Sequence, residues 1–263
     1  MPALLQALAK SGDKKANLAT IEHYASVAAS VGSEFICFPE LFMTGYNLGT
    51  TLRDLAEPMD GPSVHRLSEI ARRHNVGLIV GMPERDGDSI YNSAVAVDGQ
   101  GRVAGVCRKI QLFGAVEPEI FTPGQGLTIV TMGERRLGIL ICYDVEFPEL
   151  SRALANKGAE IICAPTANMT PFFEVPKTLV RARALENGIP FVYANLCGQE
   201  NDLHYTGLSG IVGFDGIDRA RAGRTGETLL HASFANLGAS DGDPLRSTQL
   251  NDLRLEALEV LQT

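Results

Sequence analysis

Short apolar runs alternate with amphipathic helical patterns along the first third of the chain. Apolar runs bounded by turn-forming residues are typical of buried strands, whereas apolar residues three and four positions apart are typical of helices. On these grounds we expect strands at residues 2–8, 35–38 and 76–80. Helical patterns occupy residues 13–32 and 63–74 between them. The alternation predicts a sheet with helices packed on its face.

The pattern changes to a period of two in the middle of the chain. Residues 91–97 and 102–109 are expected to form a hairpin, because an Asp-Gly-Gln-Gly turn at residues 98–101 separates them. A second pair of strands is expected at residues 128–131 and 136–142. Hairpins of this kind place antiparallel strands in the sheets.

The rest of the chain continues the alternation and then becomes polar. From residue 236 to residue 263 a Gly/Asp-rich linker and a weak amphipathic segment form a C-terminal tail, which packs on its own subunit or on a partner. Helices between some strands and hairpins between others predict a single α/β domain over residues 1–263, with two mixed sheets packed face to face and helices outside. Further strands are expected at 161–164, 191–194, 210–214 and 228–233, and helices at 149–157 and 177–187.

Composition and charge narrow the class of protein. The 263 residues are 45% hydrophobic, which suits one large core, and the net charge of -8 argues against binding to nucleic acid or anionic membranes. No apolar run approaches the roughly 20 residues of a membrane helix, and the N-terminus lacks a signal-peptide pattern. Five widely spaced cysteines without a CxxC pair favour reduced thiols over disulfides or a zinc site. A cytoplasmic protein is expected.

Cys142 lies where a buried strand pattern ends. The apolar run that precedes it leads into a turn, and Pro148 then opens a helix that stops at Gly158. In a strand-turn-helix arrangement, the positive helix end and free backbone N–H groups favour thiolate over thiol. A buried cysteine without a chemical role is the alternative interpretation of this residue taken alone.

Other polar residues also follow expected strands. Glu40 comes directly after the strand at 35–38, Lys109 ends a hairpin strand, and Glu117 lies in the loop beyond it. The five histidines lie in predicted helices or late in the chain, so a carboxylate is the expected base for a thiol nucleophile. A nearby ammonium group would lower the thiol pKa and stabilise an oxyanion.

Five sequence blocks resemble the signature blocks of the nitrilase superfamily of carbon-nitrogen hydrolases. They follow the family's order and approximate spacing over almost the whole chain, so together they are far more specific than any one of them. The blocks are Phe38-Pro-Glu-Leu41 with Gly45-Tyr46, Lys109-Ile-Gln-Leu-Phe113 with Glu117 and Phe121-Thr-Pro-Gly124, Ile141-Cys-Tyr-Asp144 with Phe147-Pro-Glu149, Ala164-Pro-Thr-Ala-Asn168, and Arg181-Ala-Arg-Ala-Leu-Glu-Asn187 with Ala194-Asn195 and Gly198.

This resemblance implies a four-layer α-β-β-α sandwich that forms a homodimer and needs no metal or organic cofactor. It makes Glu40 the general base, Cys142 the nucleophile and Lys109 the oxyanion stabiliser. Glu117 would be a second carboxylate that holds Lys109 and orients the substrate nitrogen or the water. The backbone N–H of Tyr143 would be the other oxyanion donor. The implied reaction hydrolyses an amide through a thioester.

The residues after the nucleophile bear on the substrate. True nitrilases of the superfamily usually have Trp-Glu there, whereas this chain has Tyr143-Asp144 and no tryptophan. Carbamoyl amino acid hydrolases carry arginines three and four residues beyond the cysteine, where this chain has Val145 and Glu146. The run from Tyr143 to Glu149 looks most like that of simple amidases, and this resemblance implies a small neutral carboxamide as the substrate. An N-carbamoyl amine such as carbamoylputrescine is the alternative, with Glu146 facing its cationic group.

Loops that follow strands are expected to line the substrate pocket. Gln111 stands where many relatives have histidine, which weakens assignment to a subgroup. Two other classes of protein stay open: a non-catalytic regulatory dimer that keeps the fold, and a papain-like Cys-His hydrolase. The expected pocket residues are Tyr46, Phe113, Tyr143, Glu146, Asn168 and Met169, with Phe172 or Phe173.

Overall fold

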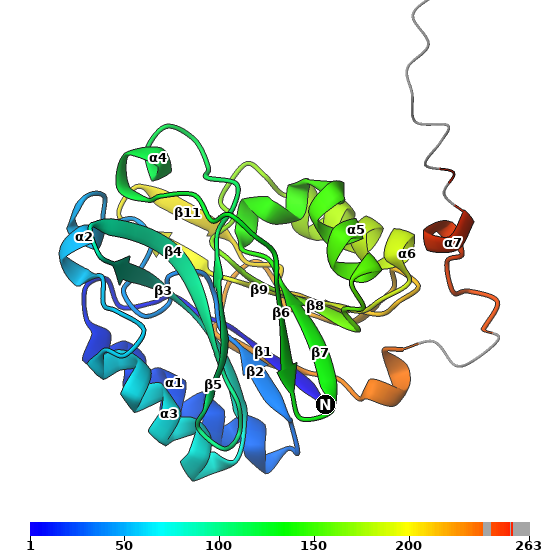
Figure 1. Ribbon diagram of the computed structural model, residues 1–263, viewed down its shortest axis with the longest axis horizontal. Coiled ribbons are helices and arrows are strands. Elements are labelled where there is room, and N and C mark those ends of the chain that lie inside the picture. Colours follow the sequence, from blue (N-terminus) through cyan, green and yellow to red (C-terminus); the bar gives the residue numbers. More distant parts are fainter. Residues whose placement is uncertain (239–242, 253, 255–263) are drawn as a thin grey trace, which may run out of the picture.

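The computed structural model describes residues 1–238, 243–252 and 254. The described residues form two six-stranded sheets that pack face to face, with strand orders β14-β1-β2-β3-β4-β5 and β13-β12-β9-β8-β7-β6. Helices cover the outer face of each sheet (Figure 1), which gives the four layers α-β-β-α. The expected arrangement of two mixed sheets with helices outside is therefore confirmed.

The first sheet comes from the N-terminal half of the chain and one late strand. Its β1, β2 and β3 run parallel, and hairpins then add β4 and β5 antiparallel. Asp13 caps the first helix by accepting a hydrogen bond from the backbone N–H of Ala16. The strands are β1 (Pro2–Gln6), β2 (Phe35–Cys37), β3 (Gly77–Asp86), β4 (Ser89–Val97), β5 (Val103–Arg108) and β14 (Thr228–His231), and the helices are α1 (Lys14–Ser30), α2 (Thr51–Leu55) and α3 (Pro62–His74).

The second sheet and its helices come from the C-terminal half. Its central strands β7, β8 and β9 are parallel, and antiparallel strands flank them. The elements are β6 (Thr128–Met132), β7 (Arg135–Ile139), β8 (Ile161–Thr166), β9 (Phe191–Asn195), β12 (Gly210–Val212), β13 (Asp218–Arg221), α5 (Pro148–Asn156) and α6 (Val180–Asn187), which continues a π-helical turn over Val175–Leu179. Smaller elements are α4 (Glu117–Ile120), β10 (Cys197–Glu200), β11 (Leu203–Thr206), α7 (Gln249–Asp252), and short 3-10 turns at Cys142–Glu146 and Phe234–Asn236.

Three apolar layers hold these elements together. One layer lies between the sheets and includes Phe35, Ile139 and Val192. A second lies under α1 and α3, and a third lies under α5 and α6. Central strands are thus buried on both faces, which explains their continuous apolar runs.

Several elements differ from those expected. β7 ends at Ile139, three residues before the expected end at Cys142, so an extended segment separates the strand from the cysteine. The β10–β11 hairpin forms a separate two-stranded sheet and was not expected, because its sequence lacks an apolar pattern of period two. The weak amphipathic segment expected in the tail lies mostly outside the described residues. None of the helices in the described part of the chain is long and apolar enough to cross a membrane.

Candidate active site

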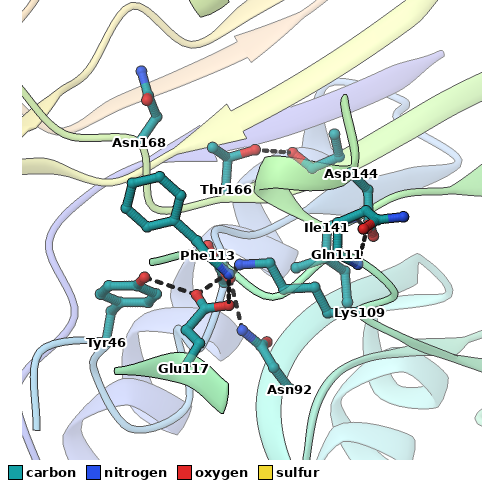
Figure 2. A network of polar contacts seen from close by, with 12 residues as sticks. Tyr46, Asn92, Lys109, Gln111, Phe113, Glu117, Ile141, Asp144, Thr166 and Asn168 are labelled. Atoms are coloured by element: carbon teal, nitrogen blue, oxygen red, sulfur yellow. Dashed lines mark hydrogen bonds and ion pairs between the residues drawn. The ribbon is translucent and has the colours of Figure 1, made fainter. Parts of the chain in front are cut away.

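Three charged side chains from distant parts of the chain meet at one end of the two sheets. Lys109 Nζ lies 2.8 Å from Glu40 Oε1 and 2.7 Å from Glu117 Oε1. The side chains of Lys109 and Glu40 are completely buried, and that of Glu117 is 5% exposed. Figure 2 shows Lys109 reaching towards the Glu117 carboxylate, with Tyr46 on the other side of it. The structure therefore brings together the three charged residues that were expected at or beyond strand ends.

Close backbone packing fixes Glu40 and Lys109. Glu40 follows β2 and lies against β3 at Gly81, where a Cβ atom would come within 2.8 Å of the Glu40 Cα, so only glycine fits. Lys109 follows β5, and its backbone N–H donates to the Asn92 carbonyl on β4 at 2.8 Å. The Lys109 carbonyl accepts a hydrogen bond from the Gly124 N–H at 2.7 Å.

Glu117 is held by both of its oxygens. Oε1 accepts hydrogen bonds from Lys109 Nζ and from the hydroxyl of Tyr46, the latter at 2.7 Å. Oε2 accepts the backbone N–H of Phe113 at 2.8 Å. Because Glu117 opens the one-turn helix α4, its side chain is anchored near the helix start rather than carried on a free loop.

Glu40 keeps one oxygen without a partner. Its Oε1 accepts hydrogen bonds from Lys109 Nζ and from Asn92 Nδ2, the latter at 2.7 Å. Its Oε2 is buried and has no hydrogen-bond partner among the described residues. A buried carboxylate oxygen with an open position is suited to accept a proton from a neighbouring group.

Cys142 lies at a sharp bend in the chain. Its φ of 48° falls in the left-handed region, which is uncommon for a residue other than glycine and often marks a functional site. The cysteine opens the turn at Cys142–Glu146 and is partly exposed, whereas Cys37 and Cys163 are buried. The bend places the thiol outside the sheet, where the charges of Glu40, Lys109 and Glu117 act on it.

The buried carboxylate of Asp144 ties this bend to the lysine loop. Asp144 accepts backbone N–H groups from Ile141 at 3.1 Å and from Gln111 at 2.8 Å. Burial raises its pKa to about 6, although these hydrogen bonds and the charge of Lys109 oppose the shift. Asp144 therefore fixes the backbone next to Cys142 relative to the backbone next to Lys109.

The surroundings of Cys142 raise the pKa of its thiol rather than lower it. Burial and the nearby Glu40 raise the pKa of the thiol well above its ordinary value, while Lys109 and the backbone N–H of Ala167 oppose them. The expectation that the strand-turn-helix geometry favours thiolate is therefore wrong. Desolvation and the Glu40 charge outweigh Lys109 and the Ala167 N–H, so the surroundings favour the thiol over the thiolate.

The charges of Glu40 and Lys109 also shift each other's pKa. Burial raises the pKa of Glu40, and so does Glu117, while Lys109 and Asn92 oppose the shift. Burial alone would lower the pKa of Lys109, but the two carboxylates outweigh it and the pKa is raised. Lys109 therefore stays an ammonium group that is available to stabilise negative charge.

Aromatic rings form a wall next to the bend. The Phe113 ring packs edge-on against Tyr143, with centroids 5.3 Å apart, and against Phe172 at 5.8 Å. Tyr143 in turn packs against Phe147 at 5.0 Å. A wall of this composition suits an apolar acyl group, and the contact of these residues with substrate stays a prediction.

Other expected pocket residues already have structural partners. The Asn168 amide donates hydrogen bonds to the Phe172 carbonyl at 2.9 Å and to Thr206 Oγ1 at 3.0 Å. It points away from Glu117 in Figure 2. Met169 is 9% exposed and packs into the layer under α1 and α3. Both residues shape the pocket loop, and their contact with substrate stays a prediction.

The two residues used to judge the substrate lie in different environments. Val145 is completely buried and packs in the apolar layer under α5 and α6. Glu146 is half-buried, and its backbone carbonyl accepts a hydrogen bond from Arg183 Nη2 at 3.0 Å. Burial raises the pKa of its carboxyl group, while Arg183 and Lys109 oppose the shift.

No histidine is placed to act on the thiol among the described residues. Four of the five histidines are exposed, and His74 lies 4.0 Å from Glu22. The charged side chains that shift the pKa of Cys142 are Glu40, Lys109 and Glu117. A papain-like Cys-His mechanism is therefore not supported.

Asn92 was not among the expected site residues. It is 1% exposed and bonds both to the Glu40 carboxylate and, through its carbonyl, to Lys109. The signal in the sequence is an asparagine in a strand that is otherwise mostly apolar. Asp144 was part of a recognised block, but only the structure shows what it binds.

Comparison with known proteins agrees with this geometry. The family model of carbon-nitrogen hydrolases matches residues 3–237. A Pseudomonas protegens protein described as a hydrolase is 40% identical over 224 residues, which cover 84% of this chain and 78% of that protein. An (R)-stereoselective amidase from a Pseudomonas species is 36% identical over 200 residues, covering 76% of this chain and 72% of the amidase.

A solved structure matches nearly the whole chain. The crystal structure of an amidase from Nesterenkonia sp. superposes with a TM-score of 0.85 and 33% identity, covering 97% of this chain and 93% of that chain. A Glu-to-Gln variant of the amidase from Nesterenkonia sp. AN1 was captured with acrylamide added to its active-site cysteine.

Proposed function

The chain belongs to the carbon-nitrogen hydrolase family, and from this membership we propose the substrate class, the residues and the steps of its cysteine-dependent amide hydrolysis. The proposed substrate is a small neutral carboxamide, which is converted to a carboxylic acid and ammonia. The observation that carries the proposal is the buried cluster of Glu40, Lys109 and Glu117 around the bend at Cys142. Folding alone would not favour burial of three charged groups.

In the first half of the proposed reaction, the thiol becomes acylated. Glu40 Oε2 accepts the proton as Cys142 Sγ attacks the amide carbonyl, which explains how a thiol with a raised pKa can react. Lys109 and the backbone N–H of Tyr143 stabilise the negative charge on the carbonyl oxygen. Glu40 then passes its proton to the amide nitrogen, the C–N bond breaks, and ammonia leaves a thioester on Cys142.

In the second half, water releases the acid. Glu40 takes a proton from water, and the hydroxide attacks the thioester carbonyl. The C–S bond breaks, and the thiolate recovers the proton from Glu40. Glu117, held at both oxygens, would orient the water and keep Lys109 in place. The cycle returns every group to its starting state.

A second substrate class, N-carbamoyl amines, is favoured by one observation. Glu146 is a half-buried carboxyl close enough to Lys109 for that ammonium group to influence its pKa. A cationic substrate end could pair with it, whereas a substrate carboxylate would be repelled.

An ammonia-release screen tests both classes. It compares neutral amides, N-carbamoyl amines, N-carbamoyl amino acids and nitriles, with the Cys142→Ala variant as the blank. Preference for neutral amides is expected. Preference for N-carbamoyl amino acids or nitriles would overturn the proposed substrate, and the absence of turnover on all four would support a non-catalytic dimer.

We also propose a cytoplasmic homodimer. Leu185 on α6 and Ile217 are 46% and 57% exposed, and Leu185 lies against Gly216 next to Ile217, so a partner subunit could cover both apolar side chains. Five unpaired cysteines suit a reducing compartment. Sedimentation velocity of the wild type and of a Leu185→Glu, Ile217→Glu variant tests the assembly. A dimer unaffected by both charges would exclude this face as its interface.

A further inference from the structure

Glu200 is a buried carboxylate outside the proposed catalytic cluster. It lies at the end of β10 and is 4% exposed. Among the described residues, four neutral groups donate hydrogen bonds to its carboxylate oxygens. These hydrogen bonds, rather than an ion pair, offset the cost of burying the carboxylate. The donors are Ser11 Oγ at 2.6 Å, the Tyr46 N–H at 3.2 Å, the Asn47 N–H at 2.9 Å and the Tyr205 hydroxyl at 2.5 Å.

These bonds fix the loop that carries Tyr46. Two successive backbone N–H groups of the loop point at Glu200 Oε2, and the Tyr205 hydroxyl donates to the same oxygen. The Tyr46 ring packs edge-on against the Tyr205 ring, with centroids 6.4 Å apart. Gly45 permits this approach, because its φ is 89° and a Cβ there would overlap Glu200 Oε1.

The far end of Tyr46 reaches the proposed catalytic cluster. Its hydroxyl donates to Glu117 Oε1 at 2.7 Å, beside Lys109 Nζ on the same oxygen. The pKa of the Tyr46 phenol is raised well above its ordinary value by burial and by the nearby carboxylates. The phenol therefore stays protonated and remains a donor to Glu117.

The same hairpin also holds the opposite wall of the pocket. The Thr206 N–H donates to the Asn168 carbonyl at 2.9 Å, and the Thr170 N–H donates to the His204 carbonyl at 2.8 Å. The hairpin thus connects the loop of Tyr46 to the loop that follows β8. Both loops contribute residues expected to line the pocket.

We propose that Glu200 is a positioning residue, which holds the Tyr46 loop so that the Tyr46 hydroxyl stays bonded to Glu117. This inference rests on the proposed function, in which Glu117 orients water and supports Lys109. Glu200 touches neither the substrate nor the thiol, and acts only through Tyr46. Loss of Glu200 should therefore have the same kinetic effect as loss of the Tyr46 hydroxyl.

A double-mutant cycle with Glu200→Gln and Tyr46→Phe tests the link. Each single change should lower kcat/KM by about tenfold, as expected for losing one hydrogen bond to a charged group. The double variant should be no slower than the slower single variant, and the pH profile of kcat/KM should shift equally in all three. Multiplying effects, or an unchanged kcat/KM in Glu200→Gln, would overturn the proposal.

Glu57→Gln is the matched control. Glu57 is a largely buried carboxylate that accepts hydrogen bonds from Ser63 at the start of α3, away from the pocket. This variant should lower the melting temperature and leave kcat/KM within about twofold of the wild type. A similar loss of kcat/KM in Glu57→Gln would show that the effect of Glu200→Gln is general destabilisation.

Crystal structures of the wild type and of Glu200→Gln separate this inference from the proposed function. The Tyr46 hydroxyl should leave hydrogen-bond distance of Glu117 in the variant. If it stays in place, the positioning role is wrong even for an active amidase. If the wild type hydrolyses no amide, the proposed function fails, while movement of Tyr46 still supports the link.

Discussion

Cys142 follows strand β7 and Cys163 lies in the neighbouring parallel strand β8, yet their surroundings differ completely. Burial raises the thiol pKa of both residues. Cys163 packs in the apolar layer between the sheets, whereas Cys142 lies beside Glu40, Lys109 and Glu117. The comparison teaches that a low resting thiol pKa is not what distinguishes Cys142. Its expected reactivity depends on a base and an ammonium group held next to it.

Replacing each cysteine with alanine should give the largest difference in amide turnover between the two positions. Cys142→Ala should lower amide turnover by at least about 10⁴-fold, because the nucleophile is lost. Cys163→Ala should keep turnover and lower the free energy of unfolding by about 1 kcal/mol, because a small core side chain is removed. Ammonia release and urea unfolding measure the two effects. Near-normal turnover by Cys142→Ala would contradict the account.

Removing Glu40, the proposed base, should have the next largest effect. Glu40→Gln keeps the size of the side chain but cannot accept the thiol proton, so kcat should fall by about 10²–10⁴-fold. Glu34→Gln is the control, since Glu34 is 51% exposed and pairs with the N-terminus. Equal kcat values for the two variants would remove Glu40 from the mechanism.

Removing the ammonium group should affect both activity and folding. Lys109→Met should lower kcat by about 10²–10³-fold through loss of oxyanion stabilisation. It should also lower the free energy of unfolding by about 3–5 kcal/mol, because Glu40 and Glu117 are left buried without their cation.

The matched change is Lys14→Met, which breaks an ion pair that is partly exposed to solvent. It should cost no more than about 1 kcal/mol and leave kcat unchanged. Similar unfolding free energies for the two lysine variants would contradict the assigned role of the buried cluster.

Asp144 should make the stability of the protein depend on pH. Its pKa is about 6 in the folded protein, above the ordinary value of 3.8. Between these pH values the folded protein holds the proton and the unfolded chain does not, so stability from this group falls as pH rises. The difference in unfolding free energy between wild type and Asp144→Asn should therefore fall by about 2–3 kcal/mol from pH 4 to 7. A constant difference in urea unfolding would show that the Asp144 pKa is not raised.

Much of the fold could be predicted because its central strands and helices have strong local patterns. The strands around Phe35 and Ile161 are continuous apolar runs, because the opposite sheet covers one face of each strand and helices cover the other. The β10–β11 hairpin has no such pattern, because its outward residues Gly198 and Gln199 are exposed and its inner contacts are polar. Its existence depends on partners distant in sequence.

Part of the candidate site could likewise be predicted from local sequence patterns. The candidate residues Glu40, Lys109 and Cys142 stand out in the sequence because each ends or follows an expected strand and matches a family block. The roles of Asn92 and Glu200 could not, because each depends on a contact between distant positions. Asn92 bonds to a carboxylate 52 residues away in the sequence, and nothing local specifies that pairing.

Inactivation by iodoacetamide tests the central claim most directly. The native protein is treated for increasing times, the alkylated fraction of each cysteine is measured by peptide mass spectrometry, and amide turnover is measured in the same samples. We predict that turnover falls in proportion to alkylation of Cys142, that Cys163 stays unmodified, and that an amide substrate slows both losses. Full turnover in protein whose Cys142 is completely alkylated would contradict the account.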